Sequence, residues 1–536
     1  MTPTRTRRSL TMLLIAAVAA MVALPASAAY AEDYVPISGA GSSWSSNAID
    51  QWRRNVQQYG MRVNYASTGS SDGRNQFKAG TVDFASSEIP YGLKDGNVVD
   101  APPSRGYAYM PLVAGGTAFM YNLSTGGKAI TNLRLSGATL TKIFTGVVTS
   151  WDDKAIKADN PGLTLPKRKI VPVVRSDGSG STAQFTTWMA NQQGKLWDAY
   201  CAKAGRSTPC GVTSNYPTIS GKGFIAQPNS QGVSGYVAQK ANIGTITYVE
   251  YSYALKTGYP VAKILNKAGY YVEPTASNVA VGLLGAKINS DKSSSSYLTQ
   301  ILTGVFNNKD PRAYPLSSYS YLIVPTRVES NFTEEKGKTL GGFAYYFLCE
   351  GQQQAEVLGY SPLPINLVKA GLEQVKKIPG VEAKSININK CNNPTFSKDG
   401  TNTLAKKAPQ PPACDKQGAA QCTTGTGGSK TDTASNGGSS SDDSSDGATD
   451  ESGDDSGTGT DTESGTGGAS SADGPVYCEA DTGVCANVVA LPVEVESESN
   501  WGMPQTFMVA AVLLLIGLVV LPPTLGQFIA RRKRQS

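Results

Sequence analysis

The segment from Thr423 to Gly474 limits what the rest of the chain can build, because it consists almost entirely of Gly, Ser, Thr and Asp. It contains 11 acidic residues and a single basic residue, Lys430. Such a segment has too little apolar surface to offset the loss of chain entropy on folding, and its like charges repel one another. With the proline-rich stretch before it, it predicts a disordered stalk over residues 394–475. Residues 32–393 remain to fold.

Both ends of the chain carry targeting patterns. Residues 1–31 join a basic start to an apolar run and the small-residue motif Ala26-Ser27-Ala28, which predicts a secretory signal peptide. Residues 503–530 are uncharged and largely apolar, and the basic tail 531–536 follows them. This pattern predicts a single transmembrane helix with a cytoplasmic tail. We therefore expect a single-pass protein of the cell membrane whose folded part lies on the extracellular side.

The eight cysteines are even in number and fall into neighbours along the chain. None has the CxxC spacing typical of zinc sites, and the chain has no histidine to complete one. Disulfides are the better interpretation, although spacing does not fix connectivity. The neighbouring pairs are Cys201 with Cys210, Cys349 with Cys391, Cys414 with Cys422, and Cys478 with Cys485, the last in a juxtamembrane segment over residues 476–502.

The absence of histidine also limits the chemistry. It excludes a Ser-His-Asp triad, an imidazole base and a histidine-ligated metal. No P-loop, kinase or Rossmann motif is present. We therefore predict a protein that is not an enzyme, with no catalytic residues, no metal and no cofactor.

The formal net charge of the chain is +6, although the acidic segment opposes it, so the part before that segment is markedly basic. A basic surface favours anions. Nucleic acid is not an expected partner, because the Lys and Arg residues of this part are dispersed and form no recognisable nucleic-acid motif.

Apolar patterning predicts alternating strands and helices. Residues 62–66, 170–175 and 244–249 are typical of short buried strands, and the spacing of the apolar residues between Ile49 and Tyr59 predicts an amphipathic helix. The fold class is therefore α/β, with a mixed and mostly parallel sheet. Ligands are expected at the carboxyl ends of its strands.

Three Gly/Ser turns stand where helices are expected to begin: 39–44, 68–73 and 175–182. Gly lets a backbone approach a ligand closely, Ser supplies a hydroxyl, and a helix N-terminus adds unpaired N–H groups. In the third turn, Arg175 can present its planar fork to two oxygens of one tetrahedral anion, with Asp177 placed to orient it. Each turn alone could be an ordinary helix cap, but together they predict an oxyanion pocket.

These turns belong to a longer series of segments that resembles the phosphate-binding protein family of bacterial phosphate ABC importers. The series keeps the family's order from Gly39 to about Leu363: GAGSSW, YASTGSSDG, GTVDFASSE, LTKIFTGVVTSWDDKAI, NPGLTLP, VVRSDGSGST and TYVEYSYA. The resemblance implies a two-lobed, type II-like periplasmic-binding-protein fold with a hinge that closes over one phosphate. Lobe 1 would comprise residues 32–113 and 275–393, and lobe 2 residues 114–274.

The resemblance also implies a set of ligand contacts, carried over motif by motif. They would be Ser43, Trp44, Ser70, Arg175, Ser179, Gly180 and Ser181, with Asp177 in support. Glu88 stands where the family usually has Asp, the residue that accepts the proton of hydrogen phosphate. Such an acceptor rejects fully ionised sulfate, because a carboxylate would face an oxygen that carries no hydrogen. The additional methylene of Glu88 alters the geometry of this acceptor.

The function implied by the resemblance is binding of inorganic phosphate and its delivery to the permease and ATPase subunits of an ABC importer. The stalk and anchor lie outside the resemblance and leave an alternative open: a surface-displayed sensor or adhesion module that binds phosphate without feeding a transporter. A phosphatase on the same scaffold is less favoured, because the sequence has no histidine and no clustered carboxylate or cysteine metal site.

Overall fold

The computed structural model describes most of the chain before the acidic segment and little after it. Described are residues 34–95, 98–294, 296–329, 331–382, 391, 393–397, 401–429 and 431–434, with the backbone of 477–478 and 485–486. The predicted signal peptide, transmembrane helix and cytoplasmic tail lie outside these residues, as does the predicted stalk beyond residue 434. Within the described part, no helix is both long enough and apolar enough to cross a membrane.

The chain divides into two units, Met1–Ser444 and Ser445–Ser536. In the second unit, strands β18 (Tyr477–Cys478) and β19 (Cys485–Ala486) pair antiparallel, with Cys478 directly opposite Cys485. The disulfide predicted between these two cysteines stays a prediction.

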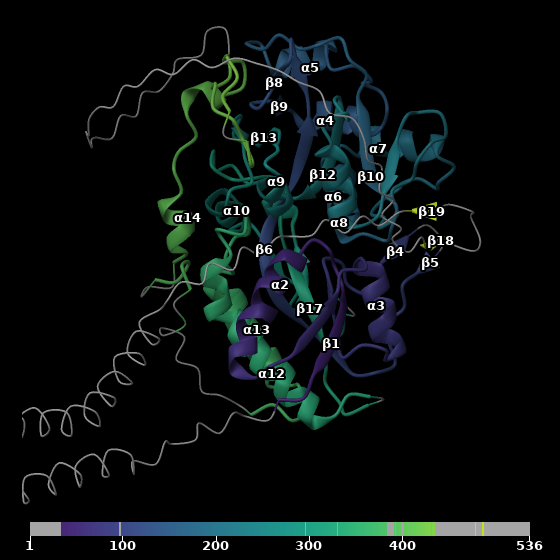
Figure 1. The fold of residues 1–536 in the computed structure, drawn as a ribbon, viewed down its shortest axis with the longest axis vertical. Coiled ribbons are helices and arrows are strands. Elements are labelled where there is room, and N and C mark those ends of the chain that lie inside the picture. Colours follow the sequence, from purple (N-terminus) through teal and green to yellow (C-terminus); the bar gives the residue numbers. More distant parts are fainter. Residues whose placement is uncertain are drawn as a thin grey trace, which may run out of the picture. The chain divides into compact units, whose positions relative to one another are not determined.

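One mixed sheet of eight strands, in the order β11-β10-β12-β6-β17-β3-β1-β2, runs through the first unit (Figure 1). Its central strand β6 (Tyr107–Asn122) is 16 residues long and almost wholly buried. The first part of β6 pairs antiparallel with β17 (Ser317–Pro325) as far as Gly116, and the last part pairs with β12 (Thr245–Glu250) from Thr117 onward. A single strand therefore joins two groups of elements.

We call the elements around β17, β3, β1 and β2 the first lobe, which is the lower group in Figure 1. Strand β1 pairs parallel with both β2 and β3, and β3 pairs antiparallel with β17. The first lobe contains β1 (Ile37–Gly41), α2 (Ser46–Asn55), η1 (Val56–Tyr59), β2 (Val63–Ala66), α3 (Ser70–Ala79), β3 (Phe84–Ser87), β4 (Lys94–Asp95), β5 (Val98–Val99), α10 (Ala276–Leu283), β15 (Lys287–Ile288), β16 (Gln300–Ile301), α11 (Thr303–Phe306), α12 (Glu334–Leu348), η2 (Glu350–Gln354) and α13 (Ile365–Val375).

The second lobe comprises the elements around β12, β10 and β11. Strand β10 pairs parallel with both β11 and β12. The second lobe contains β7 (Ser124–Thr125), β8 (Lys128–Ala129), β9 (Arg134–Leu135), α4 (Gly137–Phe144), α5 (Lys154–Asp159), β10 (Val171–Arg175), α6 (Gly180–Gln192), α7 (Gly194–Lys203), β11 (Ile225–Gln227), α8 (Asn229–Val237), α9 (Tyr251–Thr257), β13 (Lys263–Leu265) and β14 (Tyr271–Val272). The predicted α/β class and mixed sheet are confirmed, whereas the residue boundaries predicted for the lobes stay a prediction.

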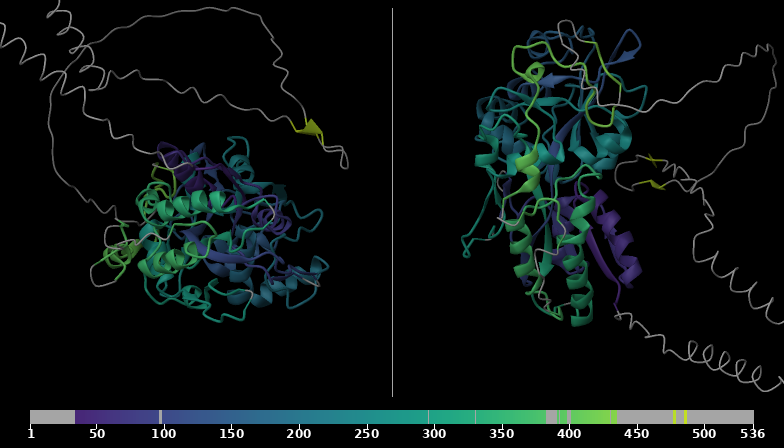
Figure 2. Two further views of the ribbon diagram at one scale, coloured as in Figure 1. Left: turned by 90° about the horizontal axis from the view of Figure 1, so that it is seen from below. Right: turned by 90° about the vertical axis from the view of Figure 1, so that its left-hand side faces the viewer.

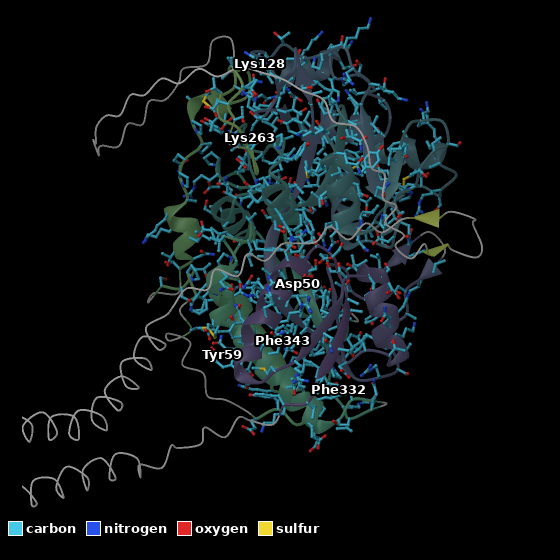
Figure 3. The ribbon with its side chains drawn as sticks, in the orientation of Figure 1. Asp50, Tyr59, Lys128, Lys263, Phe332 and Phe343 are labelled. Carbon is cyan, nitrogen blue, oxygen red and sulfur yellow. A yellow bond between two sulfur atoms is a disulfide. The ribbon has the colours of Figure 1, made fainter. Side chains whose placement is uncertain are left out.

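The packing of both lobes follows from apolar residues at the predicted spacings. On α2, the residues Ile49 and Trp52 are fully buried, and Trp52 stacks on Phe347 of α12. Also on α12, Phe343 packs against Phe84 at the centre of the first lobe (Figure 3). Buried on both faces, β6 has a nearly continuous apolar sequence rather than an alternating one, as expected for a central strand between layers of helices.

Three of the four neighbouring cysteine pairs form disulfides in the described residues: Cys201–Cys210, Cys349–Cys391 and Cys414–Cys422. Their formation confirms the disulfide interpretation over a metal site. In the described part of the chain, no cluster of three or more potential metal-ligating side chains occurs.

The folded structure extends past residue 394, where the sequence analysis placed the start of the stalk. Helix α14 (Thr403–Lys407) and the short η4 (Ala413–Asp415) lie along the outside of the unit, and the segment that carries them runs from the first lobe to the second (Figures 1 and 2). The Cys414–Cys422 loop is fixed by Arg134, whose guanidinium donates hydrogen bonds to the carbonyls of Cys414 and Ala419. Lys263 forms an ion pair with Asp415 (Figure 3).

This C-terminal segment folds although it is poor in apolar residues, because its backbone groups find fixed partners. Fully buried, Arg134 also donates to the carbonyl of Asp159 and lies over the ring of Tyr271. The Thr426 hydroxyl bonds the carbonyls of Thr131 and Val261. Hydrogen bonds and a disulfide thus replace the apolar burial that the composition lacks.

Candidate functional site

The candidate site lies where helices begin after strands of the large sheet. In the first lobe, α2 follows β1 and α3 follows β2; in the second lobe, α6 follows β10 and α8 follows β11. The three Gly/Ser turns predicted to begin helices do so, at Ser46, Ser70 and Gly180. The fourth helix start, at Asn229, was not predicted. Pro228 directly precedes its first residue, and no side chain caps the helix, so the local sequence gives little signal for this start.

The second and third turns face each other across the lobes. The Ser71 N–H donates to the carbonyl of Gly178 at 3.0 Å, and the Gly180 N–H donates to the Ser70 hydroxyl at 3.2 Å. Gly69 has a φ of +98°, and a Cβ at this position would lie 2.5 Å from Oδ2 of Asp177. Only glycine allows this backbone conformation and this approach, so the turn sequence is adapted to contact between the lobes.

The Glu88 carboxylate lies at this contact and is 1% exposed. Its Oε1 accepts hydrogen bonds from the hydroxyls of Ser42 at 2.5 Å and Ser320 at 2.8 Å. Its Oε2 accepts one from Ser70 at 2.7 Å. A Cβ on residue 180 would lie 1.8 Å from Oε2, so Gly180 is the residue that lets the carboxylate approach α6. The carboxylate therefore sits between both lobes, surrounded by hydroxyl donors.

The Arg175 guanidinium is held by Asp177 on its own turn. Its Nε donates to Oδ1 of Asp177 at 2.7 Å, and a second guanidinium nitrogen pairs with Oδ2. Asp177 also accepts a hydrogen bond from the backbone N–H of Asn229 at 2.9 Å. Because Arg175 is 4% exposed, this pair fixes a buried guanidinium rather than a mobile surface one.

A pair of serines joins Arg175 to the first lobe. The remaining terminal nitrogen of Arg175 donates to the Ser230 hydroxyl at 3.4 Å, and that hydroxyl lies 2.9 Å from the Ser43 hydroxyl. The N–H of Ser230 donates to Ser43 at 2.9 Å. The structure thus brings Ser43 and Arg175 together through Ser230, and Ser70, Glu88 and Gly180 together directly.

The other predicted site residues have different surroundings. The Ser179 hydroxyl caps α6 by accepting the N–H of Thr182. The Ser181 hydroxyl is buried and has no hydrogen-bond partner among the described residues. The Trp44 ring packs against Tyr360 and faces Gly115 of β6.

Sequence reasoning missed three serines at this site: Ser42, Ser230 and Ser320. Ser42 lies inside a turn that had been identified, and Ser230 stands at a helix start. Ser320 lies in the middle of the fully buried strand β17, where no local sequence signal marks a functional hydroxyl. Only the pairing of β17 with β3 brings it to Glu88.

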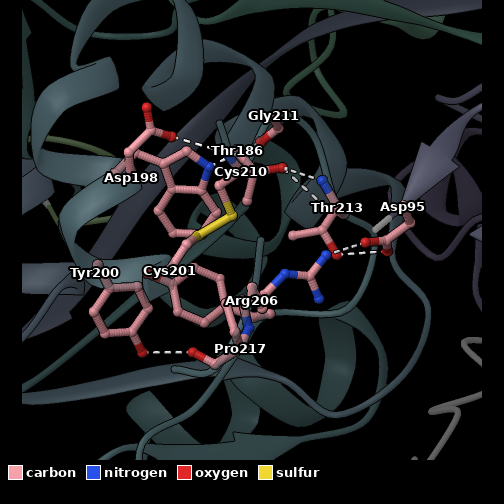
Figure 4. Close-up of a disulfide and its surroundings, with 12 residues drawn as sticks. Asp95, Thr186, Asp198, Tyr200, Cys201, Arg206, Cys210, Gly211, Thr213 and Pro217 are labelled. Carbon is pink, nitrogen blue, oxygen red and sulfur yellow. Dashed lines mark hydrogen bonds and ion pairs between the residues drawn. A yellow bond between two sulfur atoms is a disulfide. The ribbon is translucent and has the colours of Figure 1, made fainter. Parts of the chain in front are cut away.

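A second contact links the lobes beside these turns. Asp95 on the β4–β5 hairpin forms an ion pair with Arg206, and its other oxygen accepts a hydrogen bond from Thr213 at 2.6 Å (Figure 4). The Cys201–Cys210 disulfide closes the loop that carries Arg206. A cavity of about 520 Å³ lies next to this link, lined from both lobes by residues that include Ser71 and Arg206.

Glu250 is a buried carboxyl at the point where β6 changes partner, opposite Thr117. Its Oε2 accepts the N–H of Ser252 at 2.7 Å, whereas Oε1 has no partner among the described residues. Burial raises the pKa of this carboxyl well above its ordinary value, and the hydrogen bond from Ser252 opposes that rise only in part. Glu250 is therefore favoured in its neutral form.

Comparison with known proteins adds a family relationship to this geometry. Residues 25–350 match the sequence model described as the PBP superfamily domain. The phosphate-binding protein PstS of Xylella fastidiosa (strain Temecula1) is 34% identical over 338 residues, covering 62% of this chain and 83% of that protein. The phosphate-binding protein PstS of Methanocaldococcus jannaschii is 30% identical over 354 residues, covering 63% and 85%.

Solved structures are similar at lower identity. A phosphate-binding protein from Stenotrophomonas maltophilia matches with 18% identity and a TM-score of 0.47, covering 69% of this chain and 99% of that one.

A pH-dependent stability follows from Glu250. The unfolded chain releases this proton near the ordinary value of 4.5, whereas the folded chain retains it to higher pH. Between these two values the unfolded state binds fewer protons, so stability falls as pH rises. Because glutamine cannot ionise, we expect Glu250→Gln to gain stability relative to the wild type as the pH rises above 4.5. Urea unfolding at a series of pH values measures the difference.

Glu356→Gln, the same substitution at an exposed position, provides the control. A difference between Glu250→Gln and wild type that stays constant with pH would contradict the assignment of Glu250 as a neutral buried carboxyl.

Proposed function

Because the chain belongs to the PBP superfamily and, within it, to the phosphate-binding protein family, we propose that it binds inorganic phosphate outside the cytoplasm and delivers it to the permease and ATPase subunits of an ABC importer. The resemblance noted from the sequence motifs is thereby confirmed at the level of the family. The matched relatives are named as binding proteins rather than enzymes, which supports binding without catalysis.

The observation that carries the proposal is the buried Arg175–Asp177 pair set among hydroxyls from both lobes. A guanidinium held in a fixed plane offers two parallel donors to a tetrahedral oxyanion. The serine hydroxyls at positions 43, 179 and 181 and the N-terminal N–H groups of α3 and α6 can complete such a shell. We propose Ser43, Trp44, Ser70, Arg175, Ser179, Gly180 and Ser181 as the phosphate contacts, with Asp177 orienting the guanidinium.

Selectivity is proposed to rest on Glu88. A carboxylate accepts hydrogen bonds and cannot donate them, so it stabilises an oxyanion that still carries a proton and repels one that does not. Hydrogen phosphate carries such a proton near neutral pH, whereas sulfate does not. Glu88 reaches Gly180 of the second lobe despite its additional methylene, and this placement supports its role as the proton acceptor.

The apolar residues 503–530 and the basic tail 531–536 support a further part of the proposal, that the lobes are tethered to the cell membrane from outside. The acidic segment would act as the tether. A tether of this kind also fits a displayed phosphate sensor or adhesion module. Adjacency of the gene to permease and ATPase genes would separate an importer component from such a display module.

Arg175→Ala should abolish or greatly weaken phosphate binding. Removing a charge-assisted fork from a buried site typically costs about 2–5 kcal/mol, a loss of affinity of roughly 30-fold to several thousand-fold. Isothermal titration with inorganic phosphate should show one-to-one binding for the wild type and little or none for the variant. Arg53→Ala, which removes the solvent-accessible ion pair with Asp50 on α2 (Figure 3), is the matched control. Wild-type affinity in Arg175→Ala would refute the site assignment.

Glu88→Gln should weaken discrimination against sulfate, because an amide can turn its NH₂ group toward an oxygen that carries no hydrogen. Glu88→Asp, which keeps the carboxylate, should retain discrimination even where the affinity changes. Displacement of labelled phosphate by excess sulfate, measured on the wild type and both variants, tests this expectation. Equal displacement from the wild type and Glu88→Gln would mean that Glu88 is not the selector.

Protease treatment of intact cells should release the lobes into the medium by cutting the acidic segment, while an antibody against residues 531–536 should bind only after the cells are permeabilised. Both results follow from the proposed orientation. A version ending before residue 503 should appear in the medium without protease. Lobes that stay protected in intact cells would contradict the proposed topology.

A further inference from the structure

Three serine hydroxyls converge on the Glu88 carboxylate from three separate elements. Ser42 comes from the turn after β1, Ser70 from the start of α3, and Ser320 from the middle of β17. Because an ionised carboxylate can only accept hydrogen bonds, each hydroxyl must direct its single proton at it. All three serines are no more than 1% exposed. Three buried hydroxyl donors from separate elements therefore hold the Glu88 carboxylate in place.

The three donors divide unequally between the two carboxylate oxygens. Oε1 receives both Ser42 and Ser320, whereas Oε2 receives only Ser70. A carboxylate offers about two acceptor positions on each oxygen. Oε1 is thus fully used by the protein, and Oε2 retains one acceptor position. Oε2 is also the oxygen that lies against Gly180 at the start of α6.

Counting donors and acceptors also defines the role of the Ser70 hydroxyl. Its hydroxyl donates its proton to Glu88 and accepts the N–H of Gly180, so its donor capacity is spent inside the protein. The Ser70 hydroxyl therefore bridges Glu88 and α6, and the proposed contact of Ser70 with phosphate would come from its backbone.

We propose that Ser42 and Ser320 are positioning residues that set the selectivity of the site: by saturating Oε1 of Glu88 they fix Oε2 as the single acceptor for a protonated tetrahedral oxyanion, such as hydrogen phosphate or hydrogen arsenate. The inference rests on the proposed function. It explains how a glutamate with an additional rotatable bond can act at a position where a defined acceptor is needed. With two fixed donors on Oε1, rotation of the carboxylate would break two hydrogen bonds at once.

Ser320→Ala is the cleaner test, because the Ser42 hydroxyl also accepts the backbone N–H of Trp44 and so supports the turn. Dissociation constants for inorganic phosphate and for sulfate are measured on the full chain for the wild type, Ser320→Ala and Ser320→Thr. We expect the phosphate-to-sulfate selectivity ratio to fall about tenfold or more in Ser320→Ala, in line with the loss of a hydrogen bond to a charged group. Ser320→Thr, which keeps the hydroxyl, should recover most of it.

Two further variants separate positioning from a general packing effect. Ser317→Ala removes another buried hydroxyl of β17, one that bonds the carbonyl of Tyr314 instead of Glu88, and should leave the ratio unchanged. In a Glu88→Gln background, Ser320→Ala should cause no further loss of selectivity, because the group it positions has already been replaced. If Ser320→Ala fails to fold, Ser42→Ala removes the other donor to Oε1 from a different element and carries the same expectation.

A wild-type ratio in both Ser320→Ala and Ser42→Ala would overturn the proposal, as would an equal loss of affinity for both anions. Failure of the wild type itself to bind phosphate would instead refute the proposed function, and the inference with it. If the wild type binds phosphate and the serine variants keep its selectivity, only the positioning role is refuted.

Discussion

Strand β6 is the constraint on which the rest of the structure depends. Because it pairs with β17 along its first part and with β12 along its last part, both lobes share one backbone and must meet where the partner changes, at Gly116 and Thr117. A Cβ on Gly115 would lie 2.8 Å from the Trp44 ring, and one on Gly116 would lie 2.6 Å from Pro274. The two glycines let elements of both lobes pack directly against the strand. The candidate site lies in the turns that follow β1 and β2 of the first lobe and β10 and β11 of the second lobe.

The parts of the site that the sequence predicted are those with a local signal. A Gly/Ser turn at a helix start is visible in six to eight residues, and the turns around Ser43, Ser70 and Ser179 were found in this way. Ser320 could not be found, because it is one serine among several in a buried strand and acquires its partner only through the pairing of β17 with β3. Tertiary register, which no local pattern encodes, therefore decides which hydroxyl reaches Glu88.

The boundary of the folded region was misplaced for a related reason. Composition measures how much apolar surface a segment can bury, and residues 401–434 have little. It does not measure how many fixed hydrogen-bond partners a neighbouring surface offers. Three features hold this stretch against the second lobe: a buried arginine that donates to the carbonyls of Asp159, Cys414 and Ala419, a disulfide, and the Lys263–Asp415 ion pair. Since the same stretch begins at the first lobe, opening of the lobes would have to accommodate it.

The charges of the site suggest that selection depends on hydrogen bonding more than on Coulomb attraction. Arg175 is neutralised by Asp177, and Glu88 adds a negative charge, so these three groups together carry a formal charge of −1. Under the proposed function an oxyanion would enter without a net positive partner, and its stabilisation would come from fixed hydroxyl and N–H donors in a buried setting, where such donors act strongly. In that setting Glu88, a carboxylate that accepts and does not donate, would decide between anions. A ligand with a proton satisfies the open position on Oε2, whereas a ligand without one leaves two negative oxygens in contact.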